Sequence, residues 1–331
     1  MRSTLVCPGC RTASVDASGA PRLDVRTLER EGDLLACACG RRYPVVDGVP
    51  VVLADPSAFL SAEIIPLVER ELPFDVAALL AEAGPDDAPY PRLLEHLSTY
   101  LDAHWGDAAE PPTAGGLGEL VARIAARRAR PVAAAVELGC SAGRILRELA
   151  ATADEVVGVD LKLAVLRRAR RILAGEPVEF ARREVGRHYA RARLPGAPNA
   201  AGRVSIVCGD ALDPPLLPGV FGRVVALNLL DSVRSPRQLL SVVDALCAPG
   251  GEVILSSPYT WQSDVTEEHE RFGGIDPARA LTRVLTTGAD LSARYDIEEE
   301  AELPWNLRRD ARSELRYRVH YVRATKRSEA I

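Results

Sequence analysis

The second half of the chain alternates apolar runs with amphipathic stretches. Runs rich in Val, Ile, Leu and Ala predict buried strands at residues 132–138, 155–159, 204–208, 222–227 and 251–256. Apolar residues at helical spacing predict helices near residues 143–151, 161–174 and 236–247. Two later segments, 293–302 and 314–325, alternate as strands around a helical or looped bridge. This alternation of strand and helix predicts an α/β fold with a mostly parallel sheet.

Composition divides the chain into three zones. Residues 1–56 are rich in Cys, Gly and Pro and hold short β-like runs, whereas residues 57–130 have the pattern of helices. Residues 131–331 carry the strand–helix alternation. We therefore predict a small N-terminal domain over 1–56, a helical linker and lid over 57–130, and an α/β domain over 131–331.

A glycine-rich turn follows the first predicted strand. The apolar run ends in Glu137, and Gly139, Cys140 and Gly143 lead from it into a helical pattern. Glycines let a ligand approach the backbone closely, and the N-terminus of a helix supplies free N–H groups. We expect these four residues to contact a bound nucleoside or nucleotide.

A second acid supports this interpretation. The next strand ends in Asp160-Leu161, and an acid at this place can accept bonds from both hydroxyls of a ribose. The two acids and the turn between them predict the nucleoside site of an S-adenosylmethionine (SAM) methyltransferase. A nicotinamide cofactor is the alternative, but its fingerprint is Gly-x-Gly-x-x-Gly, and the spacing here is Gly139-x-x-x-Gly143.

Two later turns belong to the same predicted site. Asp210 and Ala211 follow the third strand, and Asn228 to Ser232 follow the fourth. The resemblance to SAM methyltransferases implies that Asp210 bonds the adenine amino group and that the next backbone N–H meets a ring nitrogen. A turn aspartate that caps a helix is the alternative. Asn228 borders the cofactor, because ligands of such sheets lie outside the carboxyl ends of the strands.

Four cysteines near the N-terminus predict a metal site. They form two close pairs, Cys7 with Cys10 and Cys37 with Cys39. Four thiolates on two tight turns satisfy tetrahedral zinc, although the second pair is one residue closer than usual. A module this small has little core, so the metal would supply much of its folding free energy. Four reduced cysteines without metal are the alternative.

The residues after the second pair carry a resemblance. The stretch Tyr43-Pro44-Val45-Val46-Asp47-Gly48-Val49-Pro50 is similar to the hallmark of the zinc-ribbon family typified by the activator subunit of certain tRNA and protein methyltransferases. The similarity covers residues 3–54. It implies a structural module or one that binds a partner protein, here in the first place the enzyme domain of the same chain.

Charge and hydropathy restrict the partners and the cellular compartment that we expect. The 331 residues carry a formal net charge of −5, and the sequence pI of about 5.7 argues against a protein that lives on nucleic acid. Basic runs at 123–130, 167–171 and 182–193 are interpreted as solvated helix faces. No apolar run approaches the ~20 residues that span a bilayer, so no membrane association is expected. The absence of a signal core predicts a cytoplasmic protein with reduced cysteines, and Cys140, Cys208 and Cys247 are expected to be packed thiols.

Longer motifs resemble a narrower family. They lie at residues 100–107, 179–186, 228–232, 255–261 and 303–305. Together they are similar to the methyltransferase domain of ovothiol biosynthesis, the 4-mercaptohistidine N-methyltransferase family, and more distantly to carnosine N-methyltransferase. The resemblance covers roughly residues 90–331. It implies a Rossmann-like, seven-stranded class I methyltransferase sheet whose last strand, residues 315–322, is antiparallel.

The resemblance also implies methyl transfer to an imidazole nitrogen of a small, histidine-derived substrate. Asp231 is placed to accept the ring N–H and so to fix the tautomer. Tyr259 and Trp261 are expected to stack on the imidazole and surround the sulfonium, with Tyr259 counted as catalytic. Tyr100 and His104 lie one helical turn apart and are expected on a lid over the substrate.

Simpler roles stay open for these residues, namely capping for Asp231 and core packing for the aromatic rings. The chain lacks the iron-dependent domain to which ovothiol enzymes are often fused, and the product could differ accordingly. Two rival functions are an RNA methyltransferase with a zinc ribbon and a catalytically silent SAM-binding scaffold that docks a partner.

Overall fold

A seven-stranded mixed sheet lies at the centre of the computed structural model, which describes residues 5–15, 21–68, 70–83, 85, 88–197 and 202–330. The strand order is β11-β8-β7-β12-β13-β15-β14. The strands are β7 (Val132–Leu138), β8 (Ala153–Asp160), β11 (Val204–Cys208), β12 (Phe221–Leu227), β13 (Cys247–Ser257), β14 (Ala293–Asp310) and β15 (Ser313–Ala330). The first five are parallel, and β15 is antiparallel to both neighbours. The predicted Rossmann-like α/β sheet with an antiparallel last strand is confirmed.

Successive side chains along the central strands point alternately into two hydrophobic cores, one on each face of the sheet. Ala135 and Val225 pack into one core, whereas Val136 and Val224 pack into the other. This follows from the period of two, since a central strand buries both of its faces. Helices cover both sides of the sheet: α5 (Gly118–Ala125), α6 (Arg144–Ala150) and α7 (Leu163–Leu173) contribute to the first core, and α8 (Pro236–Leu246) and α9 (Pro277–Thr287) to the second.

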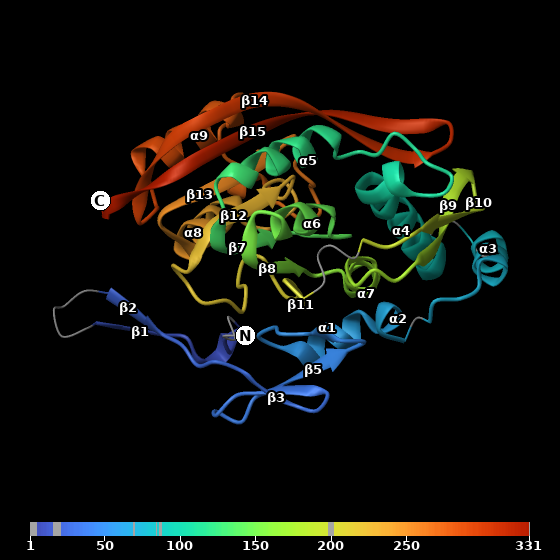
Figure 1. Ribbon diagram of the computed structural model, residues 1–331, viewed down its shortest axis with the longest axis horizontal. Helices are drawn as coiled ribbons and strands as arrows, with labels where there is room; N and C mark the ends of the chain where they lie inside the picture. The colour runs from blue at the N-terminus through green and yellow to red at the C-terminus, as the bar shows by residue number, and fades with distance from the viewer. Residues whose placement is uncertain are drawn as a thin grey trace.

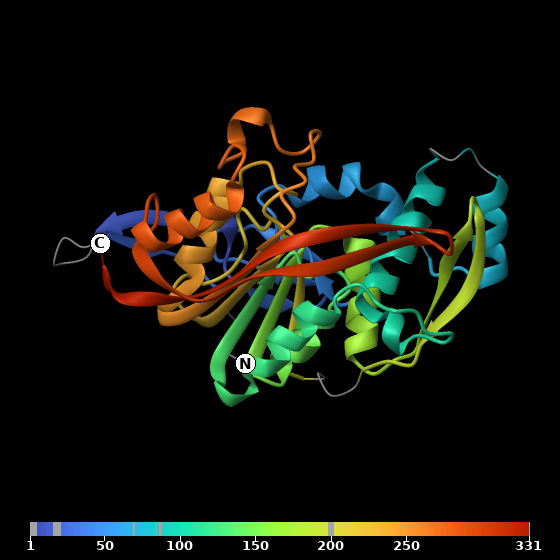
Figure 2. The same cartoon turned by 90° about the horizontal axis from the view of Figure 1, so that it is seen from above.

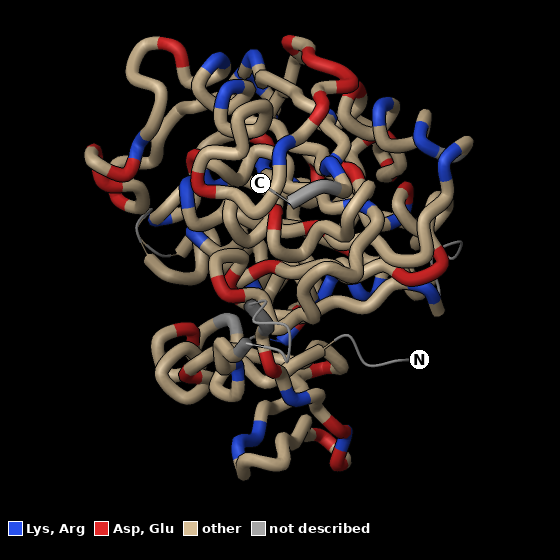
Figure 3. The backbone as a smooth tube through the Cα atoms, turned by 90° about the vertical axis from the view of Figure 1, so that its left-hand side faces the viewer, with Lys and Arg blue, Asp and Glu red and all other residues tan. Residues whose placement is uncertain are grey.

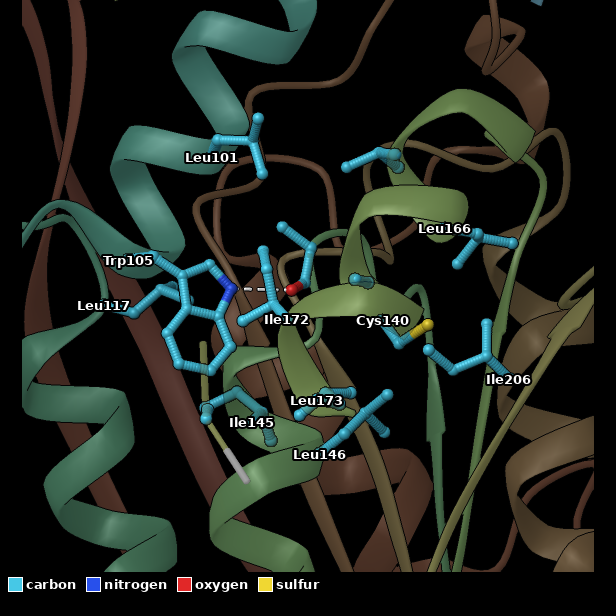
Figure 4. Close-up of a cluster of buried hydrophobic side chains, with 14 of the residues drawn as sticks. Leu101, Trp105, Leu117, Cys140, Ile145, Leu146, Leu166, Ile172, Leu173 and Ile206 are labelled. Carbon is cyan, nitrogen blue, oxygen red and sulfur yellow. Dashed lines mark hydrogen bonds between the residues drawn. The ribbon is translucent and has the colours of Figure 1, made fainter. Parts of the chain in front are cut away.

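In the described part of the predicted helical zone, helices precede α5. They are α1 (Pro56–Ala62), α2 (Ile64–Val68), α3 (Phe74–Ala83) and α4 (Pro89–Trp105). On α4, Leu97, Leu101 and Trp105 recur every four residues, and all three are buried in the first core. Figure 4 shows Leu101 and Trp105 lying against the helices that follow the glycine turn. Among the described residues, no helix combines the length and apolar character that crossing a membrane requires.

Two long hairpins depart from the sequence prediction. The strand pattern of β14 continues to Asp310, so the helical or looped bridge expected between the last two strands is wrong. Leu303 and Leu307 remain buried and continue the alternation, and Pro304 is tolerated because β14 is an edge strand. The basic run 182–193 lies on a second hairpin, β9 (Val178–Val185) and β10 (His188–Leu194), and not on a helix.

These hairpins meet at one end of the molecule. The β14–β15 pair (red) arches over the sheet and reaches β9 and β10 (Figures 1 and 2). The backbone N–H of Ala311, in the β14–β15 turn, donates to the carbonyl oxygen of Glu184 on β9 over 3.0 Å. This contact holds the turn end of the β14–β15 hairpin beside α4, near the carboxyl ends of the parallel strands.

The N-terminal residues form a smaller lobe beside the sheet (Figure 3). Its strands are β1 (Thr12–Val15), β2 (Pro21–Asp24), β3 (Glu29–Glu31), β4 (Leu34–Ala36), β5 (Arg42–Val46) and β6 (Val49–Pro50). Val51 forms a parallel bridge with Cys208, and the Val52 N–H donates to the carbonyl oxygen of Cys208 over 2.9 Å. The lobe thereby continues the sheet beyond its edge strand β11.

Candidate active site and metal centre

A cavity of about 640 Å³ opens at the carboxyl ends of the parallel strands. Most of the residues singled out from the sequence line it: Tyr100, His104, Glu137, Gly139, Asp160, Leu161, Asp210, Ala211, Asn228 and Asp231. These residues come from five separate segments of the chain. The topology gathers them because parallel strands end at a common edge of the sheet.

The glycine turn forms the floor of this cavity. Gly139 has φ +77°, and a Cβ there would lie 3.0 Å from Cδ1 of Leu229, so glycine keeps the turn open and unstrained. Gly143 has φ +80° and caps the N-terminus of α6. The Sγ of Cys140 is buried in the first core, so Cys140 and Gly143 shape the turn without lining the cavity.

Glu137 is a buried acid with no ion-pair partner among the residues that the structure describes. Its side chain is 2% exposed, and among the described residues its Oε2 has no hydrogen-bond partner. Burial, and then the nearby Asp160, raise the pKa of Glu137 well above its ordinary value. A cationic or N–H-bearing ligand would satisfy this carboxylate.

Asp160 is held by the backbone around it. Its Oδ2 accepts from the N–H of Ser141 over 2.9 Å, and its Oδ1 accepts from the N–H of Lys162 over 2.8 Å. Burial raises its pKa, although these two bonds oppose the shift. The carboxylate therefore has a fixed orientation at the end of β8.

Asp210 already has two partners within the chain. Its Oδ1 accepts from the N–H of Leu212 over 2.8 Å, and its Oδ2 accepts from Arg234 over 3.0 Å. Asp210 thus lies in a turn, but among the described residues no helix follows it before β12, so it does not cap a helix as the alternative supposed. Asp210 lines the cavity together with Ala211, but its carboxylate would have to exchange a partner to bind a base.

Asp231 lines the cavity. Its Oδ2 accepts two bonds from Thr260, from the N–H over 2.9 Å and from Oγ1 over 2.8 Å. Its Oδ1 is buried and has no partner among the described residues. Asn228, three residues earlier, has φ +53° and is held by Ser256, whose Oγ donates to its Oδ1 over 2.8 Å.

Helix α4 contributes a second stripe, which faces the cavity. Tyr100 and His104 lie on it as predicted, and His96, one turn earlier, is a member that sequence reasoning missed. Burial lowers the pKa of His96 to about 4 and that of His104 to about 3, with smaller contributions from Lys162 and Arg144 respectively. The N–H of Arg144 donates to Nδ1 of His104 over 3.3 Å. Both imidazoles are therefore neutral at physiological pH.

The aromatic wall comes from the hairpin and not from the predicted turn. The Tyr259 hydroxyl pairs with Nδ1 of His320 over 2.9 Å, and Trp261 packs edge-on against Phe272, so the structure does not bring these rings to the cavity. Trp305 and Tyr317 are cross-strand partners on β14 and β15, and their rings stack 4.8 Å apart on the cavity wall.

The cavity has an acidic lining. Its carboxylates are Glu137, Asp160, Asp210, Asp231 and Asp264, and Lys162 is the only lysine or arginine among the described lining residues. This balance favours a cationic ligand over an anionic one.

The four N-terminal cysteines converge as predicted. Their sulfur atoms all lie within 4.8 Å of one another, with 3.9 Å between Cys7 and Cys39 and 3.7 Å between Cys10 and Cys37. Tetrahedral zinc with bonds of about 2.3 Å sets its sulfurs about 3.8 Å apart. The group therefore has a geometry that could hold a metal ion.

Arg41 favours the thiolate of Cys39, whereas the neighbouring Cys39 thiol raises the pKa of Cys10 to about 12 and burial raises that of Cys37. The Arg41 N–H, followed by the neighbouring thiols, lowers the pKa of Cys39 to about 6. The Arg41 guanidinium also approaches the Cys39 sulfur at 3.8 Å and donates to the carbonyl oxygen of Gly9 over 3.0 Å. The remaining cysteines, Cys140, Cys208 and Cys247, are buried free thiols, as expected.

Residues 136–255 match the family model described as "Methyltransferase domain". The matched segment begins in β7 and ends in β13, so it contains the glycine turn, Asp160, Asp210 and Asp231. The chain carries a SAM-dependent methyltransferase domain. It is an enzyme, and its sheet is of the class I methyltransferase type. No curated protein matches the sequence.

Solved structures similar to this methyltransferase are distant. A magnesium protoporphyrin IX methyltransferase from Synechocystis with bound SAM is 15% identical, with a TM-score of 0.40, and the match covers 63% of this chain and 77% of that one. The N-methyltransferase NodS from Bradyrhizobium japonicum with S-adenosyl-L-homocysteine is 15% identical, with a TM-score of 0.41 and coverage of 76% and 97%. The [4+2]-cyclase SpnF is 13% identical, with a TM-score of 0.44 and coverage of 64% and 82%.

The residues of the methyltransferase domain fit SAM. The unpartnered Oε2 of Glu137 and the acidic lining suit a ligand with an ammonium and a sulfonium. Gly139 leaves space against Leu229 that a Cβ would fill, and Asp160 lines the cavity at the end of β8. Glu137, Gly139 and Asp160 are residues that could hold the cofactor.

Proposed function

We propose that this methyltransferase acts on an imidazole nitrogen of a histidine-derived small molecule, such as a 4-mercaptohistidine-like thiol-imidazole. The observation that carries the proposal is the carboxylate of Asp231. The residue lines the cavity but is only 2% exposed; Thr260 holds one of its oxygens, and the other is a buried atom without a partner among the described residues. A buried acceptor of this kind costs free energy unless a ligand supplies the donor.

A neutral imidazole supplies that donor. One ring nitrogen carries a hydrogen and the other carries a lone pair, and the unperturbed pKa of about 6.5 leaves much of the ring neutral at physiological pH. Oδ1 of Asp231 accepts the N–H, which fixes the tautomer and the rotation of the ring. The opposite nitrogen then points its lone pair away from Asp231, toward the cofactor side of the cavity.

The bound cofactor supplies a methyl group on a positively charged sulfur. The protein's contribution is alignment, because an in-line displacement needs the lone pair and the carbon–sulfur bond on one axis. Such positioning can be worth roughly 7–11 kcal/mol. Glu137 and Asp160 orient the donor side, and Asp231 orients the acceptor side. The proton that leaves the methylated ring has Asp231 as its nearest acceptor.

The walls of the cavity support a small, flat acceptor. The stacked pair Trp305 and Tyr317 lies on one side, and Tyr100, whose ring is 4.5 Å from that of His96, lies on α4. Planar rings favour stacking with an imidazole. The acidic lining disfavours a phosphate-bearing substrate, which counts against an RNA methyltransferase.

The basic runs also have partners within the chain. On the β9–β10 hairpin, Arg182 pairs with Asp102 at 2.7 Å and Arg183 pairs with Glu95 at 2.5 Å. On α7, Arg167 pairs with Asp47. Blue and red segments are interspersed over the body of the molecule in Figure 3. Arginines engaged in this way are poor candidates for an RNA-binding face.

We further propose that Cys7, Cys10, Cys37 and Cys39 hold structural zinc, and that residues 1–56 are a zinc-ribbon domain ahead of a helical segment, 57–130, and the methyltransferase domain, 131–331. Support comes from the sulfur separations and from the docking of this lobe on β11. The lobe's first partner would then be the enzyme domain of its own chain.

The experiment that tests the function is a substrate panel. Purified protein with SAM is assayed for S-adenosyl-L-homocysteine release against histidine, 4-mercaptohistidine, ergothioneine-like compounds and carnosine, with guanine- and adenine-containing RNA as the comparison. We expect turnover of a thiol-imidazole or histidine compound and N-methylation of its ring by mass spectrometry. Turnover confined to RNA, with a steep salt dependence, would reject the proposal.

A further inference from the structure

Thr260 connects the turn after β13 to Asp231. Among the described residues, it is the only residue of this turn whose side chain forms a hydrogen bond with the Asp231 carboxylate. Thr260 supplies both of the bonds that Oδ2 of Asp231 receives. The backbone N–H of Gln262 adds a bond to the carbonyl oxygen of Asp231 over 3.1 Å. The position of this short turn therefore sets the orientation of the Asp231 carboxylate.

The turn has a costly backbone. Tyr259 has φ +54° and Trp261 has φ +26°, so residues with side chains occupy the left-handed region on both sides of Thr260. Such a backbone conformation is strained for a residue with a side chain, and it persists only when the surroundings enforce it. Some contact outside the turn must hold it in place.

A hydrogen-bond chain through the buried His320 provides that contact. The Tyr259 hydroxyl pairs with Nδ1 of His320 over 2.9 Å, and Nε2 of His320 pairs with Glu300 over 2.9 Å. Because a carboxylate accepts, Nε2 of His320 carries the hydrogen, and Nδ1 then accepts from the Tyr259 hydroxyl. Thr282 on α9 donates to the same oxygen of Glu300 over 3.0 Å. His320 is only 3% exposed, so the middle of the chain is shielded from water, whereas the Glu300 side chain at its end is exposed.

We propose that Thr260 is a positioning residue, which holds Oδ2 of Asp231 so that Oδ1 alone is offered to the acceptor, and that Tyr259, His320 and Glu300 anchor the turn that carries it. The proposal rests on the proposed function for the role of Asp231. It gives Tyr259 a task behind the cavity in place of direct contact with substrate. It also explains why the strained turn lies beside an acid whose second oxygen is unpartnered.

The test compares Thr260→Val with Thr260→Ser. Valine keeps the shape and the backbone N–H but removes the hydroxyl donor, whereas serine restores it. A hydrogen bond to a charged group is worth enough to lower kcat about 10- to 100-fold, and serine should recover most of the rate. SAM affinity by calorimetry should not change in either variant. Thr266→Val is the matched control. Thr266 lies in the same segment as Thr260, and the substitution likewise removes a hydroxyl, which is buried and donates to the carbonyl oxygen of Val233. This variant should keep a kcat near that of the wild type.

A second measurement does not depend on the substrate. Crystal structures of the two Thr260 variants should show Asp231 in more than one orientation with valine and in a single orientation with serine. A single, unchanged Asp231 conformer with valine would overturn the positioning role, as would a kcat equal to that of Thr266→Val. If the wild type methylates a non-imidazole acceptor, the proposed function fails, while the same variants on that acceptor still test Thr260. Tyr259→Phe, which removes only the bond to His320, should give a smaller loss of kcat in the same direction.

Discussion

The indole N–H of Trp105 donates to the carbonyl oxygen of Ala142 over 2.7 Å, and both residues are buried (Figure 4). The bond joins the last turn of α4 to the glycine turn beneath the cavity. The Arg144 guanidinium lies over the same indole at 5.2 Å. Three residues earlier on the helix, Asp102 forms a buried pair with Arg182. The helix predicted as a lid is therefore anchored at its base, and its contacts position the floor of the site.

Trp105→Phe should weaken both the fold and the cofactor site. The substitution keeps an aromatic ring in the core but leaves the Ala142 carbonyl without its donor, which costs about 1–3 kcal/mol of unfolding free energy. SAM affinity should fall as well, because the turn that approaches the cofactor loses a support. Urea denaturation and calorimetry measure the two effects. Trp261→Phe alters an indole outside the cavity, and it should leave SAM affinity unchanged.

Asp231→Asn should separate binding from catalysis. The amide preserves size, but it offers a weaker acceptor or a donor to the ring N–H, so turnover should fall by about 10- to 100-fold or more. SAM affinity should remain nearly unchanged, because the residues proposed to hold the cofactor, Glu137 and Asp160, lie on other strands, β7 and β8. Steady-state kinetics and calorimetry on the same preparation make the comparison. Equal activity in the variant would remove Asp231 from the mechanism.

Glu137 should make the stability of the ligand-free protein depend on pH. Its pKa is raised by folding, so the folded protein holds this proton more tightly than the unfolded chain does. The contribution is fully present below the unfolded value near 4.5, and it is lost as pH rises toward the folded pKa. Glu137→Gln should therefore lose less unfolding free energy than the wild type between pH 4.5 and neutral pH.

Urea titrations at a series of pH values measure that slope. Asp160, whose pKa is also raised, adds a slope of the same sign and remains in the variant, so the variant's dependence should be reduced and not abolished. Asp154→Asn, at an exposed acid on β8, is the control. Identical slopes for the wild type and Glu137→Gln would contradict the prediction.

Removal of the metal should destabilise the N-terminal lobe first. We expect one zinc per chain by elemental analysis, and its loss on treatment with a strong chelator or in Cys37→Ser. Because such a site supplies folding free energy to a small module, proteolysis within residues 5–53 should accelerate and the melting temperature should fall. Cys247→Ser changes a buried thiol outside the cluster and should retain the metal. Preparations that hold no zinc yet resist proteolysis would contradict the proposal.

Strong local patterns made most of the fold predictable. Val132–Leu138 and Val204–Cys208 have the predicted bounds as strands, because a continuous apolar run beside a turn has few other solutions. The four cysteines converge as expected, because two close pairs of cysteines are the spacing typical of residues that bind one metal ion together. The extent of β14 was hidden by its alternation, in which only one face is apolar and a proline interrupts the pattern.

The substrate side was less predictable. Tyr259 and Trp261 lie in the loop after β13, as the sequence predicted. Their rings, however, contact His320 and Phe272 and do not line the cavity. Trp305 and Tyr317 reach the cavity only because the hairpin register pairs them, and register is a long-range property. His96 was missed although it lies one turn before Tyr100 on the same helix stripe, which helical spacing could have indicated.

The docking of the N-terminal lobe on β11 has a consequence for solubility. An uncovered edge strand offers a row of free N–H and C=O groups, which other chains can extend into intermolecular sheets. Here the segment through Val51 and Val52 occupies that row at Cys208. A chain without the N-terminal lobe would expose the edge strand β11 to pairing with other chains. The lobe therefore protects the enzyme from self-association in addition to extending its sheet.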